Sequence, residues 1–186
     1  GNSAADLVVQ DLQVSPGSPA SGSLLTISWV ERNAGLGVTP VGWSDRIVVR
    51  NLDSNEVLLD RNLAYDPTLA GNAPLAPDGS LQRSTTLRLP DGARGAGRIQ
   101  VQVTADRTNA LPEYDGASVS ADGNNSATVT VTATQRDYAD LRISQFTVPG
   151  TGRGGDALRL GWTVANDGAD ATTASWVDRL VLSTDT

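Results

Sequence analysis

The sequence has 186 residues, a length that suits one or two domains, and its formal net charge is −7. Such an acidic chain is a poor match for nucleic acid, which proteins bind through clustered cations. Cysteine and histidine are absent and the 14 basic residues are all arginine, so disulfides, Ser–His and Cys nucleophiles, Schiff bases and most catalytic zinc sites are excluded.

Two-residue alternation of apolar and polar side chains dominates the chain, and this period predicts β-strands rather than helices. Turn-forming residues such as those at 16–19 and 90–92 break the pattern, and residues 61–79 are predicted to form a long connection. About seven short strands within roughly 130 residues are typical of an all-β, Ig-like or fibronectin-type antiparallel β-sandwich. In chain order the predicted strands cover residues 6–14, 23–32, 45–51, 56–59, 81–89, 98–104 and 127–131.

The same alternation predicts which side chains fill the core between two such sheets, because every second residue of a half-buried strand faces inward. The predicted core consists of Leu25, Ile27, Trp29, Ile47, Val49, Leu87, Leu89, Ile99, Val101, Val103, Val129 and Val131.

An internal repeat divides the chain. Four sequence blocks recur in the same order, with an offset of 134 residues at the opening Asp-Leu and of 133 at the strand tryptophan. The matched blocks are Asp6-Leu7 with Asp140-Leu141, Trp29 with Trp162, Asn33-Ala34-Gly35 with Asn166-Asp167-Gly168, and Trp43-Ser44-Asp45-Arg46 with Trp176-Val177-Asp178-Arg179. A constant offset of this kind indicates a repeated structural unit. The sequence therefore predicts a complete sandwich at 5–134 and, at 139–186, an incomplete second unit with the first three strands only.

The tryptophans are interpreted mainly as packing residues. Trp29 and Trp162 stand at inward positions of their strands and are predicted to anchor cores. Trp43 and Trp176 each lie two residues before an Asp-Arg pair, so they either pack at the end of the sandwich or face a ligand there. Asp45 and Arg46 are adjacent, and a local ion pair between them is one interpretation.

The loop between residues 105 and 126 is the candidate metal site. Calcium takes six to eight hard oxygen ligands from a loop that can fold around it. The alternative is a solvated loop whose side chains cap local turns, and the sequence leaves both open. The candidate calcium ligands are Asp106, Asn109, Glu113, Asp115, Asp122, Asn124 and Asn125.

These motifs resemble the CARDB family, the cell-adhesion-related domain found in bacteria. The resemblance rests on the opening Asp6-Leu7, the Asn33-Ala34-Gly35 turn, the Trp-x-Asp-Arg strand from Trp43, the Leu89-Pro90 ending and the closing Asn124-Asn125. The chain departs from the family pattern in a longer gap between Glu113 and Asn124 and in two residues, rather than one, between Val30 and Asn33. The resemblance implies sandwich modules strung along large secreted or surface proteins, with no single ligand.

The resulting expectation is a non-catalytic extracellular repeat module that acts as a structural spacer or adhesion module, with calcium as its one candidate cofactor. The alternative is a module that binds a glycan or a protein through loops at one end of the sandwich, and a third class is a hydrolase with two facing carboxylates in a cleft. The expected partners are neighbouring repeats of the same polypeptide and a second copy bound through the incomplete unit, without nucleic acid or membrane insertion. No signal peptide or membrane-spanning run is apparent, so we expect a mature segment of a secreted or cell-surface protein.

Overall fold

A computed structural model describes residues 4–111 and 122–183 of the chain, the side chain of Asp122 excepted. The chain divides into two compact units, the first ending at Arg136 and the second beginning at Asp137. None of the described helices is long and apolar enough to cross a membrane.

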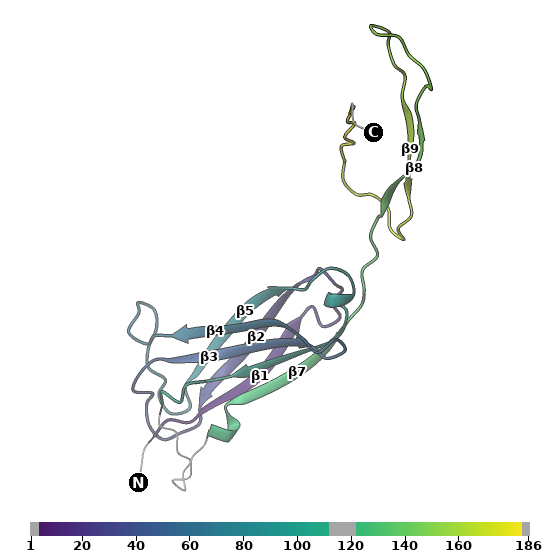
Figure 1. Ribbon diagram of the computed structural model, residues 1–186. Coiled ribbons are helices and arrows are strands. Elements are labelled where there is room, and N and C mark those ends of the chain that lie inside the picture. Colours follow the sequence, from purple (N-terminus) through teal and green to yellow (C-terminus); the bar gives the residue numbers. More distant parts are fainter. Residues whose placement is uncertain (1–3, 112–121, 184–186) are drawn as a thin grey trace. The chain divides into compact units, whose positions relative to one another are not determined.

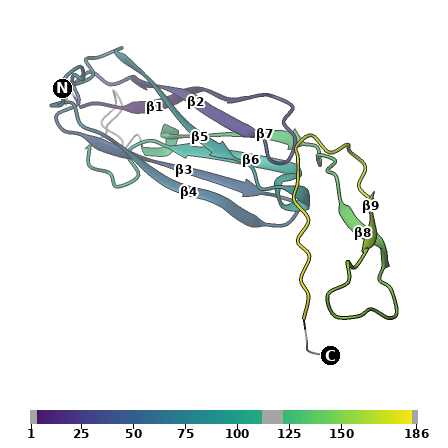
Figure 2. The same ribbon diagram turned by 90° about the horizontal axis from the view of Figure 1, so that it is seen from above.

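The first unit is built from two antiparallel sheets that face each other (Figures 1 and 2). One sheet has the order β1-β2-β5, with β1 at Leu7–Ser15, β2 at Leu24–Asn33 and β5 at Ser80–Arg88. The other has the order β4-β3-β6-β7, with β4 at Glu56–Tyr65, β3 at Trp43–Asn51, β6 at Gly97–Thr104 and β7 at Ser126–Ala133. The short 3₁₀ helices η1 (Gly92–Gly95) and η2 (Asp122–Asn124) precede β6 and β7. The predicted all-β antiparallel sandwich is confirmed.

The predicted core is also confirmed, with a gradient from the central to the outer strands. Nine of the twelve predicted residues are buried, whereas Leu87, Val129 and Val131 are only partly buried. These three lie on β5 and β7, which are the edge strands of their sheets, so a neighbouring strand covers them on one side only. The core also contains residues from outside the predicted set, namely Leu7, Val9, Trp43, Tyr65, Leu75 and Leu111.

Strand β4 is longer than the alternation predicted. It continues from the predicted stretch at 56–59 to Tyr65 because β3 offers backbone partners along its whole length, from Asn51 opposite Glu56 to Trp43 opposite Tyr65. The predicted long connection therefore begins at residue 66, five residues later than predicted. Tyr65 anchors it, since the phenol O–H donates to the Ala73 carbonyl at 2.9 Å and accepts the Ala73 N–H at 3.2 Å.

The second unit contains a two-stranded antiparallel sheet of β8 (Leu141–Thr147) and β9 (Gly161–Asn166). The prediction of a third strand in this unit is wrong, because residues 176–182 pair with no neighbouring strand in the described part of the chain. A strand is defined by its ladder of backbone hydrogen bonds, and in the first unit β3 obtains them from β4 and β6. Counterparts of β4 and β6 do not occur among residues 137–183.

Candidate functional site

The predicted calcium loop begins with a buried turn at Asp106. Its side chain is 1% exposed, and its two carboxylate oxygens accept the backbone N–H groups of Ala110 and Leu111 at 2.9 and 2.8 Å. Asp106 and Asn109 both adopt positive φ, at 42° and 49°, which short polar residues tolerate best. Asp106 therefore closes the turn after β6 and holds the buried Leu111 in place.

Two more of the candidate ligands, Asn124 and Asn125, lie just before β7. Asn124 donates its amide N–H to Asp6 Oδ1 at 2.9 Å, and Asn125 is buried at the start of β7. Glu113, Asp115 and the side chain of Asp122 lie outside the described residues. Among the described residues no group of three acidic, histidine or cysteine side chains is placed to hold a metal ion. The described residues of the loop thus fit the turn-capping alternative, and calcium stays a prediction.

A second cluster of side chains lies buried between the two sheets, and we call it the carboxyl cluster. It consists of Glu31, Asp45, Arg83 and the two tryptophans that border them, Trp29 and Trp43. Glu31 lies on β2 and is fully buried. The indole N–H groups of Trp29 and Trp43 donate to its two oxygens at 3.3 and 3.0 Å. Trp43 also packs on Tyr65, with ring centroids 4.7 Å apart. The packing interpretation of both tryptophans is therefore correct, and one carboxylate ties β2 to β3.

Asp45 completes the cluster from β3. It is fully buried, and its Oδ2 lies 3.0 Å from Nη2 of Arg83, which is 7% exposed and lies on β5. The interpretation of a local Asp45–Arg46 pair is wrong, because neighbours on a strand point to opposite faces of the sheet. Arg46 instead bonds the exposed Asp60 on β4, with Nε–Oδ1 and Nη2–Oδ2 distances of 2.8 and 2.6 Å.

The electrostatics of the carboxyl cluster favour one bound proton. Burial, and after it the nearby Glu31 carboxylate, raise the pKa of Asp45 from 3.8 to about 9. This value is reached although the Arg83 guanidinium and the Asp106 backbone amide act in the opposite direction. At neutral pH the Asp45 carboxyl is accordingly protonated. Because both carboxyls are fully buried, a substrate cannot reach them, and the facing acids that a hydrolase needs are sealed inside the sandwich.

The Asn-x-Gly turn after β2, which we call the Asn-x-Gly corner, is closed by hydrogen bonds between the Asn33 side chain and the backbone. The Asn33 side-chain carbonyl accepts the N–H groups of Asp6 and Gly35, both at 3.0 Å, and its amide donates to the Gly37 carbonyl at 2.7 Å. A Cβ on Gly35 would clash with the backbone at Ala4. Only glycine fits this closely against the incoming chain.

The second unit has the same corner. Asn166 accepts the N–H groups of Asp140 and Gly168 at 2.9 and 3.0 Å and donates to the Asp170 carbonyl at 2.7 Å. A Cβ on Gly168 would clash with the Tyr138 carbonyl. Three hydrogen-bond roles and one steric requirement thus match between the corners.

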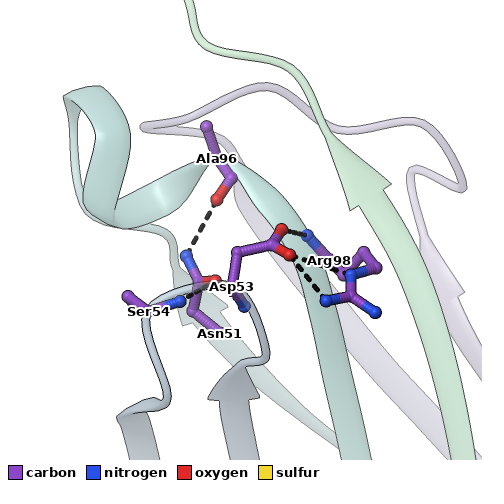
Figure 3. A network of polar contacts seen from close by, with 5 residues as sticks. All are labelled: Asn51, Asp53, Ser54, Ala96 and Arg98. Carbon is purple, nitrogen blue, oxygen red and sulfur yellow. Dashed lines mark hydrogen bonds and ion pairs between the residues drawn. The ribbon is translucent and has the colours of Figure 1, made fainter.

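A polar network lies at the end of the sandwich where β7 finishes (Figure 3). Asn51, which is 1% exposed, donates to the carbonyls of Arg94 and Ala96 and accepts the Asp53 N–H at 2.9 Å. The Asp53 carboxylate accepts the backbone N–H of Arg98 at 2.7 Å and its Nε–H at 2.9 Å. The network joins the β3–β4 turn to η1 and the start of β6.

The segment that joins the two units is held by hydrogen bonds before and after Asp137. Thr134 exchanges backbone bonds with Pro19 and Ser21, at 3.0 and 2.8 Å, and the Arg136 N–H donates to Ser21 Oγ at 2.9 Å. Two residues later, the Tyr138 carbonyl accepts the Asp170 N–H of the second unit at 3.4 Å. Asp137 alone separates these anchored positions.

Comparison with known proteins gives a likeness at the level of the fold. No family model matches the sequence, and no curated protein matches it. The solution structure of a CARDB domain from a Pyrococcus furiosus protein has a TM-score of 0.50 at 17% identity, covering 73% of this chain and 100% of that one. The crystal structure of the same domain, in complex with di-metal ions, has a TM-score of 0.48 at 16% identity and covers 70% and 90%. The fold of this chain is therefore CARDB-like.

Proposed function

We propose that the chain is a non-catalytic structural module, a spacer or adhesion unit of CARDB-like fold in a secreted or cell-surface protein. The observation that carries the proposal is the junction at Asp137. A coil linker of many residues makes two domains independent, whereas one residue between anchored positions restricts the accessible angles. A chain of such units would transmit position and force along its length, as a stalk requires.

The matched Asn-x-Gly corners support the repeat on which a stalk depends. Each corner fixes the point where the chain enters a unit against the end of that unit's second strand, at Asn33 in one and Asn166 in the other. Equivalent entry geometry is what a tandem array needs, since each module then begins in the same way.

The alternative function, binding of a glycan or a protein through loops at one end, requires exposed aromatic rings in that region. In the first unit, Trp29, Trp43 and Tyr65 are 0%, 3% and 8% exposed, so these three rings are used in packing. This burial favours the spacer over the binding module.

The spacer proposal is tested by the distance distribution between spin labels in the two units. The chain has no cysteine, so Thr128→Cys on β7 and Gln145→Cys on β8, both at exposed positions, provide the only labelling sites. We expect a narrow distribution that broadens when about six Gly/Ser residues are inserted after Asp137. A native chain as broad as the insertion variant would contradict the proposal.

A further inference from the structure

The first and last strands of the first unit, β1 and β7, lie side by side and are joined at both ends (Figure 1). At their starts, Asn124 in front of β7 donates its amide N–H to Asp6 in front of β1 at 2.9 Å. At their ends, Thr134 after β7 forms a parallel bridge with Ala20 after β1. The strand by which the chain enters the unit is therefore linked directly to the strand by which it leaves.

The link at the exit end consists of three hydrogen bonds over a short parallel stretch. The Thr134 N–H donates to the Pro19 carbonyl at 3.0 Å, and the Ser21 N–H donates to the Thr134 carbonyl at 2.8 Å. The Arg136 N–H donates to Ser21 Oγ at 2.9 Å. Because Pro19 and Ser21 are buried, water has restricted access to these bonds from the side of the sandwich.

The segment that receives these bonds is itself fixed to the rest of the unit. The Gly22 N–H donates to the Pro90 carbonyl at 3.0 Å, which ties the segment to the end of β5. The Ser23 N–H donates to the Ala20 carbonyl at 3.0 Å, and the Ala20 N–H donates to Ser23 Oγ at 3.2 Å. Residues 19–23 therefore form a closed turn that can hold Thr134 under load.

A pull along the chain loads this link in its resistant direction. The chain reaches residue 19 through β1, and from residue 134 it runs on to Arg136, where the first unit ends. Tension along the chain therefore draws the two parallel segments in opposite directions along their own axes. All three bonds must then stretch together, whereas a pull across the segments would open them one after another.

We propose that residues 19–21 and 134–136 form a mechanical clamp, through which tension passes directly from β1 to the segment that follows β7. Load that takes this route bypasses β2 to β6, which supply most of the buried core. The inference rests on the proposed spacer function, and it names the element of the spacer that carries load.

Unfolding of the full chain under constant force tests the clamp in two pulling directions, because resistance to forced unfolding is set by the unfolding rate. The chain has no cysteine, so the handles have defined positions. The first pair, at the N-terminus and at Asp137→Cys, pulls through the clamp. The second pair, Ser54→Cys and Ala93→Cys, lies at exposed positions and peels β4 and β5 from their sheets. We expect slower unfolding at the same force through the first pair.

The decisive variant is Ser21→Ala, which removes the acceptor of the Arg136 N–H and adds no bulk. Through the first pair it should unfold about fivefold faster than the native chain, a rate change that corresponds to one lost hydrogen bond. Through the second pair its rate should change less than about twofold. The matched control is Ser126→Ala, which loses the Oγ contact with Thr104 at the start of β7 and should change neither rate by more than about twofold.

A second variant, Thr134→Pro, removes the N–H that donates to Pro19 and should act in the same way as Ser21→Ala. Equal acceleration of Ser21→Ala in both directions would overturn the proposal, because the serine would then be an ordinary stabilising residue. Native unfolding rates that are independent of direction would also overturn it. The result is separate from that of the spin labels, since it measures bonds within the first unit and not the angle between the units.

Discussion

The proton at Asp45 makes the first unit lose stability as the pH rises. The pKa of Asp45 is about 9 in the folded chain against an ordinary value of 3.8. Between these values the folded state holds a proton that the unfolded state has released, so the free energy of unfolding falls with rising pH. Full stability from this group is present below pH 3.8, and the decline ends near pH 9. For one proton the slope is at most about 1.4 kcal/mol per pH unit.

The composition of the chain makes this loss of stability easy to measure between pH 5 and pH 8. With no histidine and no cysteine, no other side chain of ordinary pKa titrates between pH 5 and 8. The exposed carboxylates of Asp53, Glu56 and Asp60 have pKa values lowered by their arginine partners. Their stabilising contribution is present above pH 3.8 and is lost only as the pH falls through their folded pKa values, outside the window.

The assay is urea unfolding followed by tryptophan fluorescence at pH 5 and pH 8. Trp162 and Trp176 are already 41% and 51% exposed, so the change reports Trp29 and Trp43. Three pH units give a loss of up to about 4 kcal/mol, a shift in the midpoint of about 2 M for an m-value near 2 kcal/mol/M.

Asp45→Asn removes the titrating proton and keeps a donor toward Glu31, so its midpoint should be nearly independent of pH. Asp60→Asn on β4 is the matched control and should retain the native slope. A native midpoint that is flat from pH 5 to 8, or an Asp45→Asn chain with the native slope, would refute the proton assignment.

Three further predictions concern stability at a single pH. Gly97→Ala should lower the free energy of unfolding by about 2–4 kcal/mol, since residue 97 has φ of 96° and a Cβ there would clash with the Asp53 carboxylate. Gly92→Ala, where φ is 67° and the space is open, should cost only about 1–2 kcal/mol, from the left-handed backbone alone. Equal costs of the two substitutions in urea unfolding would contradict this. Asp106→Asn should lose one buried hydrogen bond and about 1–3 kcal/mol, and the loss should be the same in calcium and in chelator, because a loss confined to calcium would make Asp106 a ligand instead of a turn residue. Trp29→Ala should cost about 3–5 kcal/mol by emptying the core and freeing one oxygen of Glu31, and a change below about 1 kcal/mol in thermal unfolding would show that the side chain does not fill the core.

The strands could be predicted from the sequence because period-two alternation is a local property. It located all seven strands of the first unit and nine of the seventeen buried residues that form the core between the sheets. The extension of β4 to Tyr65 could not be predicted in this way. Residues 60–62 are Asp, Arg and Asn, a polar run with no alternation, and they form a strand because β3 supplies backbone partners.

The carboxyl cluster shows which contacts local sequence patterns cannot predict. One signal was available, since Glu31 stands at the same strand parity as Trp29, and a charged residue at an inward position needs a buried partner. The arginine that faces the neighbouring Asp45 could not be identified from the local sequence. Arg83 is 38 residues after Asp45 and lies on the other sheet, so only the register of β2 with β5 brings it to the aspartate.

The difference between the two units at this position has a physical consequence. In the first unit Glu31 receives both indole N–H groups, which leaves Asp45 to share its proton and to face Arg83. In the second, Val164 stands at the position of Glu31, and Trp162 donates directly to Asp178. The second unit therefore lacks the carboxylate neighbour that, after burial, contributes to raising the pKa of Asp45. The glutamate two residues after the strand tryptophan therefore adds to the pH sensitivity that burial of Asp45 gives the first unit.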